Sequence, residues 1–580
     1  MKNAEIAKIF YDMADILEIN NENQFRVRAY RRAALNIEGH PKDAALLSVE
    51  DLRKIPGIGE DLAGKIKEIT ETGTCADYEK LKKKYPAGLT EILAIPGLGP
   101  KTAKFLYDKF KVKGIDNLEM LAREHKLKGP GIKEKTEMNI IKGIEMLRGR
   151  QTERHPIGKV LPSARELMEY LAKSSAVQKI SIAGSLRRWK ETIRDIDILA
   201  ASARPDELMD YFVKLPQVSR VLAKGPTKSS VVIGHGSNGI QADLRVVEEG
   251  AYGAALCYFT GSKEHNIRLR EMAVKRGLKV NEYGVFDLKG KKIGGQREED
   301  VYQALGLPYI PPELREDSGE IDAALEDSLP RLIELSDIKG DLHVHSKQSD
   351  GSYPVEKLIE AARERGYSYM ALTDHSKSLG IARGLDEQKI LEQIKMIDAL
   401  NRKLRGFRLL KGVELDIRGD GALDLPDALL ARLEIVNASI HSGFRQDAAR
   451  VTGRIVRAME NPYVNVISHP TGRLIGEREA YGLDFERVLK AAKETGTALE
   501  INCYPARLDL NDQMARRARD MGIPLVISTD AHVLTHFEFM EYGVEVARRA
   551  WCGPGDVLNT LDLKNLLAAL AAKRRKLAAV

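Results

Sequence analysis

Cysteine and long apolar runs are both scarce in this chain of 580 residues. The four cysteines are scattered and form no CxxC pair, so we expect no disulfide framework and a reducing compartment. No apolar run approaches the roughly 20 residues that a bilayer requires, and the opening MKNAEIAKIF contains no apolar segment of a signal peptide. We therefore expect a soluble, cytoplasmic protein without a membrane partner.

Neither sign of charge dominates the chain. Lys and Arg number 91 against 84 Asp and Glu, which gives a net charge of +7. A mildly basic balance suits an anionic partner but does not demonstrate one. The hydrophobic fraction of 43% is ordinary for a globular protein. Since one hydrophobic core rarely grows beyond roughly 250–300 residues, we expect several domains.

Residues 1–150 combine helical periodicity with a short repeat. An apolar stripe at 6, 9, 10, 13 and 17 predicts a helix near the start. Ile-Pro-Gly-Ile-Gly at 55–59 recurs as Ile-Pro-Gly-Leu-Gly at 95–99, and a looser copy lies at 129–132. One such copy could be only a tight turn. Two copies between helices resemble helix-hairpin-helix motifs, in which glycines and helix N-termini bind DNA phosphates without reading sequence. We assign DNA contacts to Gly57, Gly59, Gly97, Gly99 and Lys101.

Two aspartates lie two residues apart on a predicted strand in the middle of the chain. On a strand, that spacing points the carboxylates of Asp195 and Asp197 to one face. Asp243 lies on the polar side of another alternating run, 240–246. Three clustered carboxylates need cations, and two Mg²⁺ ions would suit an in-line phosphoryl transfer. A lone Asp-x-Asp is more often a solvated edge, so the surrounding residues decide between the two interpretations.

A phosphate-binding pattern precedes these aspartates. The Gly184-Ser185 turn offers backbone N–H groups and a hydroxyl to a polyphosphate, and Arg188 offers a bidentate contact. The stretch GSLRRWKETIRDIDIL at 184–199 and the motif YFTGS at 258–262 resemble family X DNA polymerases, the group of DNA polymerase beta. The resemblance covers residues 1 to about 315 and includes the Pro-Gly-x-Gly repeats. It implies template-directed DNA synthesis from dNTPs on gapped or nicked double-stranded DNA.

The resemblance also assigns roles to single residues. Asp195 and Asp197 match ligands of both metal ions, and Asp243 matches the ligand that helps to deprotonate the primer 3′-OH. The other matched residues contact the nucleotide or the template: Gly184, Ser185 and Arg188 at the triphosphate, Tyr258, Phe259 and Gly261 at the sugar, Asn266 at the base, and Arg270 at the template.

Three positions depart from the family pattern. Gln241 replaces an arginine near the primer end, and Lys263 replaces an acidic residue beside the nucleotide. Lys263 could bind the nucleotide before the template arrives, or it could be a solvated helix residue. Lys65 matches a lyase lysine that excises 5′-deoxyribose phosphate, with Tyr30 as its matched support, but Asp77 replaces a second supporting lysine. We slightly favour a phosphate contact for Lys65 over Schiff-base chemistry, which needs a lysine of lowered pKa.

From residue 339 onward, short apolar runs alternate with helical stretches, which is typical of a mainly parallel α/β domain. Nearly every predicted strand ends in His, Asp or Glu. Because strand ends of an α/β barrel converge on one face, this series predicts a metal site. One such histidine would more often be structural, but a series of seven motifs is hard to explain in that way. The candidate ligands are His343, His345, Asp350, His375, Glu414, His441, His469, Asp530 and His532.

This series resembles the PHP (polymerase and histidinol phosphatase) domain over about 338–575. The resemblance implies a distorted (β/α)₇ barrel whose trinuclear site has all nine ligand positions filled. Imidazole and carboxylate without thiolate suit Mn²⁺, Zn²⁺ or Fe. We expect a metal-dependent 3′–5′ exonuclease, with possible abasic-site endonuclease or 3′-phosphatase activity. A small-molecule phosphatase, an idle metal scaffold and a template-independent nucleotidyltransferase are the alternatives.

The fold class that follows is multidomain, with α+β and α/β parts. We expect a monomer that fills short gaps in base excision repair. The predicted divisions are an N-terminal helix-hairpin-helix domain at 1–90, a fingers-like helix-hairpin-helix domain at 91–152, a nucleotidyltransferase palm at 153–256, a thumb at 257–316, a linker at 317–337 and the PHP phosphoesterase at 338–575.

Overall fold

The computed structural model describes residues 3–20, 22–38, 44–55, 57–84, 89, 91–95, 98–127, 136–138, 140–141, 143–144, 154–234 and 239–578. The chain forms two compact units, Met1–Arg154 and His155–Val580. In the described part of the chain, no helix is both long enough and apolar enough to cross a membrane. All four cysteines are buried and free.

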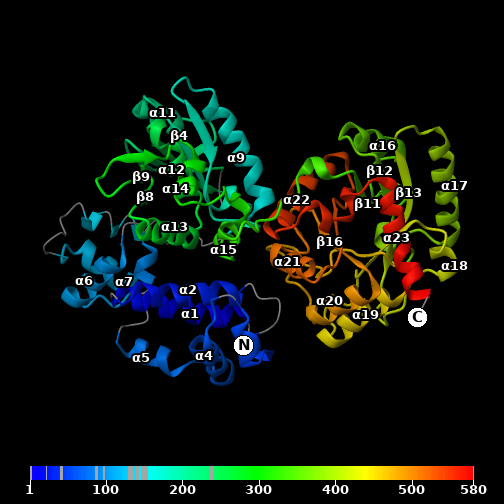
Figure 1. The fold of residues 1–580 in the computed structure, drawn as a ribbon, viewed down its shortest axis with the longest axis horizontal. Helices are drawn as coiled ribbons and strands as arrows, with labels where there is room; N and C mark the ends of the chain where they lie inside the picture. Colours follow the sequence, from blue (N-terminus) through cyan, green and yellow to red (C-terminus); the bar gives the residue numbers. More distant parts are fainter. Residues whose placement is uncertain are drawn as a thin grey trace. The chain divides into compact units, whose positions relative to one another are not determined.

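The first unit is helical (Figure 1). Its apolar stripe is buried as predicted, because Ile6, Phe10, Met13 and Leu17 of α1 pack against α2 and α4. The two repeats precede helices: Gly59 is the N-cap of α4 and Gly99 the N-cap of α6. Pro96, Gly97, the third copy at 129–132 and the Lys101 side chain lie outside the described residues. The helices are α1 (Asn3–Ile19), α2 (Gln24–Glu38), α3 (Val49–Arg53), α4 (Glu60–Thr72), α5 (Ala76–Lys84), α6 (Pro100–Phe110) and α7 (Ile115–Arg123).

The second unit begins with a mixed five-stranded sheet in the order β2-β4-β7-β6-β5. Strands β4 and β7 are parallel, and the other pairs are antiparallel. The predicted strand that carries Asp195 and Asp197 and the alternating run at 240–246 are strands β4 and β7 of this sheet. Strands β1 and β3 pair in a separate two-stranded sheet. The elements of this part of the chain are β1 (His155–Pro156), α9 (Ile157–Ala172), β2 (Lys179–Ile182), α10 (Gly184–Arg187), β3 (Thr192–Ile193), β4 (Asp195–Ala201), α11 (Pro205–Val213), β5 (Val218–Lys224), β6 (Lys228–Ile233) and β7 (Ile240–Val247).

A thumb of helices and a small antiparallel sheet follows, with strand order β10-β9-β8. The segment predicted as a linker packs against it, because Ile321 and Ala324 join the thumb core and a carboxylate oxygen of Glu320 lies 2.7 Å from His265 Nδ1. The elements are α12 (Tyr252–Thr260), α13 (Lys263–Lys275), β8 (Lys279–Asn281), β9 (Gly284–Phe286), β10 (Lys292–Gly294), α14 (Glu298–Ala304) and α15 (Glu320–Leu325).

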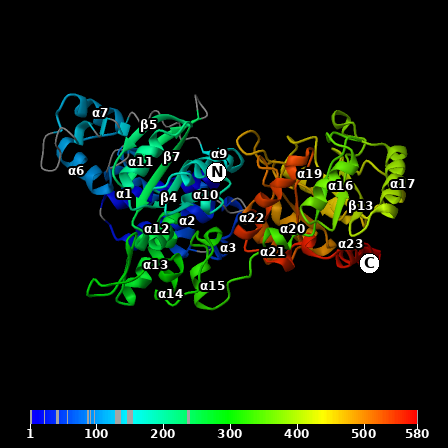
Figure 2. The same cartoon turned by 90° about the horizontal axis from the view of Figure 1, so that it is seen from above.

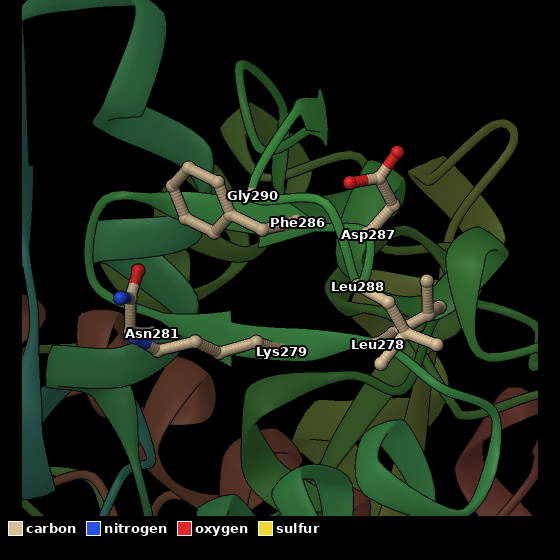
Figure 3. Close-up of a pocket in the computed structure, with 7 residues that line it drawn as sticks. All are labelled: Leu278, Lys279, Asn281, Phe286, Asp287, Leu288 and Gly290. Atoms are coloured by element: carbon tan, nitrogen blue, oxygen red, sulfur yellow. The ribbon is translucent and has the colours of Figure 1, made fainter.

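Two pockets flank this small sheet. One, of about 480 Å³, lies over β8 and β9, where Lys279 and Asn281 face Phe286 and Leu288 (Figure 3). None of the predicted nucleotide or metal contacts lines it. The other, of about 520 Å³, is lined by Phe259, Arg245 and Tyr283 among others, so it lies beside the predicted sugar wall.

The C-terminal part is a parallel seven-stranded sheet in sequential order from β11 to β17. The chain after β17 returns to β11, where the His345 N–H donates to the Ala531 carbonyl at 2.9 Å. Figures 1 and 2 show the helices around this nearly closed barrel, and the expected (β/α)₇ PHP fold is confirmed. Its elements are β11 (Gly340–Val344), α16 (Val355–Glu364), β12 (Tyr369–Leu372), α17 (Glu387–Lys403), β13 (Arg408–Asp416), α18 (Asp427–Leu430), β14 (Ile435–Ser439), α19 (Ala448–Glu460), β15 (Val466–Ile467), α20 (Phe485–Thr495), β16 (Ala498–Asn502), α21 (Asp512–Asp520), β17 (Leu525–Ser528), α22 (Met540–Arg549) and α23 (Leu563–Ala578).

Candidate functional site

The predicted palm carboxylates lie on two neighbouring parallel strands. The register of β4 and β7 places Asp197 opposite Asp243 and Asp195 opposite Gln241. Since alternate residues of a strand share a face, all three aspartates lie on the same side of the sheet. The pairing thus brings together carboxylates that are almost fifty residues apart in sequence.

The negative charge at this face is only partly balanced by the protein. Burial, and then the charges of Asp195 and Asp243, raise the pKa of Asp197 to about 7. Lys228 lies 2.6 Å from one oxygen of Asp243, and the Gln241 side chain donates to its other oxygen at 2.8 Å. An acidic face of this kind suits divalent cations, which would favour the charged form of Asp197.

The Gly184-Ser185 turn lies directly over the aspartates. Gly184 has a φ of +62°, and a Cβ there would come 2.1 Å from a carboxylate oxygen of Asp197. Only glycine therefore allows the turn to approach the carboxylate this closely. Arg188, at the end of α10, donates to the Thr260 carbonyl at 2.5 Å and lies 3.1 Å from Glu316.

The remaining predicted nucleotide contacts cluster where α12 meets α13. The rings of Tyr258 and Phe259 meet edge to face at 5.1 Å in the last turn of α12. The Asn266 side chain donates to the Tyr258 carbonyl at 2.6 Å, and Arg270 donates to the Asn266 carbonyl at 3.2 Å. Gly261 ends α12 with a φ of +76°, and a Cβ there would come 3.1 Å from the Arg188 guanidinium. Lys263 begins α13.

Lys65 is paired with two carboxylates in the first unit. It binds Asp61 one turn earlier in α4 and lies 3.3 Å from Asp77. Burial lowers the pKa of this lysine, but the hydrogen bond to Asp61 and the neighbouring Tyr30 and Asp77 outweigh burial and raise it. Because a Schiff-base nucleophile must be neutral, this environment favours a charged, phosphate-binding lysine.

The nine predicted PHP ligands converge at the carboxyl ends of the barrel strands. Three groups have ligand atoms within 4.8 Å of one another: His345, Asp350, His375 and His532; His343, His345, Glu414 and Asp530; and His375, Glu414 and His441. His469 completes the set, because its Nε2 lies 2.9 Å from Glu414. Glu414 therefore lies at the centre of the cluster. His343, His345 and Glu414 are buried, whereas Asp350 and His532 keep about 30% of their side chains exposed and mark the open side.

Several of these ligand atoms are buried without a hydrogen-bond partner in the described part of the chain. They include His343 Nε2, both ring nitrogens of His345, His375 Nδ1 and Glu414 Oε2. They approach carboxylate oxygens instead: His375 Nδ1 lies 2.8 Å from Glu414, and His343 Nε2 lies 3.3 Å from the same oxygen. Orphaned polar atoms are costly when buried. Divalent cations between them would satisfy these atoms, so the residues fit a metal cluster.

Outer partners of the ligands were not identified from the sequence. Buried Glu500 lies 2.7 Å from His343 Nδ1 and accepts the His469 N–H at 2.6 Å. Asp416 lies 3.3 Å from His441 Nδ1. Such carboxylates fix the tautomer and orientation of metal-binding histidines. Glu500 and Asp416 follow the same pattern of acidic residues near strand ends, which is the signal that could have identified them.

The chain matches known families along most of its length. The matches are a helix-hairpin-helix domain at 1–75, a SAM-like helix-hairpin-helix tandem at 89–146, a DNA polymerase beta thumb at 255–316 and a PHP domain at 341–503. A protein named DNA polymerase/3′-5′ exonuclease PolX from Bacillus subtilis (strain 168) is 40% identical over 572 residues, 98% of this chain and 99% of that protein.

The PHP part also has shorter relatives. Probable phosphatases of Thermoanaerobacter sp. (strain X514) and Syntrophotalea carbinolica are 33% and 31% identical over 251 and 229 residues. These matches cover 41% and 38% of this chain, and 96% and 90% of the two relatives. The match over nearly the whole chain, together with the thumb and PHP domains, shows that this chain belongs to the PolX family of DNA polymerase/3′-5′ exonucleases, the family X polymerases with a C-terminal PHP domain.

Proposed function

We propose that this enzyme fills short gaps by template-directed synthesis and trims 3′ ends with its PHP domain, as a monomer in base excision repair. The observation that carries the proposal is the register of β4 and β7, which sets Asp197 opposite Asp243 under the Gly184 turn. The division predicted from the sequence into five domains and one linker is part of the proposal.

In the polymerase site, two Mg²⁺ ions would be held by Asp195, Asp197 and Asp243. When bound, they would polarise the phosphate and lower the pKa of the primer 3′-OH. The protein positions the reactants: the Gly184-Ser185 turn and Arg188 hold the triphosphate, and the α12 end carries the sugar wall. Asp243 accepts the hydroxyl proton, and Gln241 orients its carboxylate through the 2.8 Å hydrogen bond.

In the PHP site, up to three Mn²⁺ or Zn²⁺ ions would be held by the nine ligands, Glu414 among them. When bound, they would activate water and stabilise the departing oxyanion. The buried histidines hold the closed side of the site, while Asp350 and His532 border the open side from which a phosphodiester can enter. Cleavage at abasic sites and removal of 3′ phosphates would use the same residues.

The N-terminal unit would hold DNA on both sides of a gap through the helix N-termini after Gly59 and Gly99. Lys65 would bind a 5′ phosphate there. Lyase chemistry at Lys65 stays the alternative.

A second candidate function for the PHP domain is hydrolysis of small phosphomonoesters. Its support is the similarity to probable phosphatases over nearly their whole length. The helix-hairpin-helix domains of the same chain favour a polynucleotide instead.

The test is a labelled one-nucleotide-gapped duplex incubated with and without dNTPs, in Mg²⁺ and then in Mn²⁺. Extension by one nucleotide with dNTPs and 3′ shortening without them are expected. A parallel assay with p-nitrophenyl phosphate separates the two PHP candidates. Faster turnover of the small ester than of DNA would favour the phosphatase, and extension of single-stranded primer alone would contradict template use.

A further inference from the structure

The palm segment 188–191 joins the triphosphate-binding turn to the aspartate strand. It follows α10, which carries Ser185, and it precedes β4, which carries Asp195. A shift of this segment would therefore move both halves of the polymerase site. Each of three residues in it is contacted by the PHP barrel.

The first contact runs through Arg549, the last residue of α22. Its guanidinium donates to the Arg188 carbonyl at 2.6 Å and lies 3.1 Å from Glu316. Glu316 in turn lies 3.1 Å from the Arg188 guanidinium. Arg549 thus contacts the backbone of Arg188 directly and its side chain through one shared carboxylate.

This network is removed from solvent. The Arg549 side chain is only 5% exposed, against 13% for Arg188 and 16% for Glu316. Asp512 at the start of α21 lies 2.6 Å from Arg549 and fixes it on the barrel side. Buried, charge-assisted pairs hold geometry more firmly than exposed ones.

Two further contacts hold the same segment. The Trp189 ring meets the Tyr542 ring of α22 edge to face at 5.7 Å. Glu191 lies 2.7 Å from Arg473, which follows the metal-ligand candidate His469 by four residues. Arg473 is itself held by the carbonyls of Arg507 and Leu508. The apolar cores of the palm and the barrel are also continuous.

We infer that Arg549 of the PHP barrel is a positioning residue for the polymerase: by holding Glu316 and the Arg188 carbonyl, it aims Arg188 at the triphosphate of the incoming nucleotide. The barrel then serves synthesis as well as hydrolysis. This inference rests on the proposed role of Arg188 in nucleotide binding. Misplacing a binding group by about 1 Å can cost as much as 100-fold in rate.

The test compares Arg549→Met with Arg548→Met in the full chain. Arg548 is the matched control, because it lies on the same helix but pairs with the Glu313 side chain at 2.9 Å and the Ile333 carbonyl at 2.8 Å rather than with Arg188 or Glu316. Arg549 also donates to the Glu313 carbonyl at 3.4 Å, so the control keeps that backbone contact. Single-nucleotide gap filling gives KM for dNTP and kcat separately. We expect Arg549→Met to raise KM on the order of 10-fold, with kcat and exonuclease rate within about 2-fold of wild type. Arg548→Met should leave KM unchanged.

A second variant covers the case in which Arg549→Met unfolds the barrel by leaving Asp512 unpaired. Glu316→Gln keeps the Arg549–Asp512 pair and removes the charge that links Arg549 to Arg188. It should raise KM for dNTP as well. In an Arg188→Ala background, neither change should raise KM for dNTP further, because the Arg188 guanidinium that they would displace is absent.

The outcomes are distinguishable. If wild type fails to fill the gap, the proposed function fails. If wild type fills it but Glu316→Gln and Arg549→Met match Arg548→Met in KM, Arg549 is not a positioning residue. Additive effects of Arg188→Ala and Glu316→Gln would equally overturn the inference.

Discussion

The palm site and the PHP site both rely on carboxylates carried by strands or by the loops that follow them, but they are built differently. The palm uses three aspartates on one open sheet face, without histidine, and one of them is paired with the partly exposed Lys228. The PHP site places five histidines around Glu414 and a sixth, His532, beside Asp350, and it keeps most of them buried. Oxygen-only ligands suit Mg²⁺, whereas imidazole-rich sites suit transition metals.

The difference lies in what holds each site in the absence of cations. Outer carboxylates such as Glu500 orient the PHP histidines, so that cluster is preorganised. In the palm, burial and repulsion among the aspartates raise the pKa of Asp197 to about 7. The barrel thus holds the PHP ligands in place by itself, whereas the palm site would be completed by the metal ions and nucleotide that we propose it binds.

Removing a palm carboxylate should have the largest effect. Asp197→Ala or Asp243→Ala should lower gap filling on the order of 10⁴-fold, because each acts as part of one catalytic unit. The exonuclease of the same variants should stay within about 2-fold of wild type, as measured on a labelled 3′ end. Retained synthesis in both variants would contradict the palm assignment.

Breaking the PHP cluster should give the reciprocal result. His343→Ala and Asp530→Asn should lower 3′–5′ degradation by more than the roughly 100-fold that outer-shell changes cause. Gap filling should be largely intact. Metal analysis of both purified variants should show less bound transition metal than wild type. If these variants degrade 3′ ends at the wild-type rate, the PHP domain is only a metal-binding scaffold.

The outer carboxylate offers a finer test of preorganisation. Glu500→Gln should lower PHP metal affinity or exonuclease rate by about 10–100-fold, because the amide cannot accept from both His343 and His469 equally well. Glu434→Gln is the control, since Glu434 pairs with Arg408 at 2.9 Å and precedes β14, at the end of the strand opposite to the metal ligands. Equal loss in the two variants would point to general destabilisation. Titrating each variant with metal ions while exonuclease activity is measured compares the two variants in metal affinity and in rate.

Lys228 provides a test of whether a protein side chain competes with Mg²⁺ for a palm carboxylate. Lys228→Met removes the cation that competes with Mg²⁺ for Asp243. The Mg²⁺ concentration that gives half-maximal gap filling should therefore fall by about 2–5-fold. Lys224 lies on the neighbouring strand β5 and pairs with Asp210 of α11, so Lys224→Met should not change the Mg²⁺ requirement. A higher Mg²⁺ requirement in Lys228→Met would mean that the lysine supports metal binding.

The smallest effect is expected outside both sites. Lys65→Ala should weaken binding to 5′-phosphorylated gaps. The affinity should also fall less steeply with salt concentration, by the amount expected for about one lost phosphate contact. Gap filling and 3′–5′ degradation of gapped DNA should both fall, because each requires the enzyme to bind the DNA. Borohydride trapping of wild type on a pre-incised abasic substrate, lost in Lys65→Ala, would instead establish the lyase.

The sequence by itself determined the helical start, the palm strands that carry the aspartates, the parallel α/β rhythm and every candidate PHP ligand. It could do so because these features repeat at short spacing: apolar residues along α1, aspartates two apart on β4, and acidic or histidine residues at strand ends. Each is a local consequence of helix or strand periodicity.

Only the tertiary structure decided which distant residues meet. It placed Asp197 opposite Asp243, Glu500 behind His343, and Lys228 against the palm carboxylate. It also packed α15, which lies in the segment predicted as a linker, into the thumb core. Strand register and long-range ion pairs depend on how whole elements pack, and no spacing within a short segment encodes them.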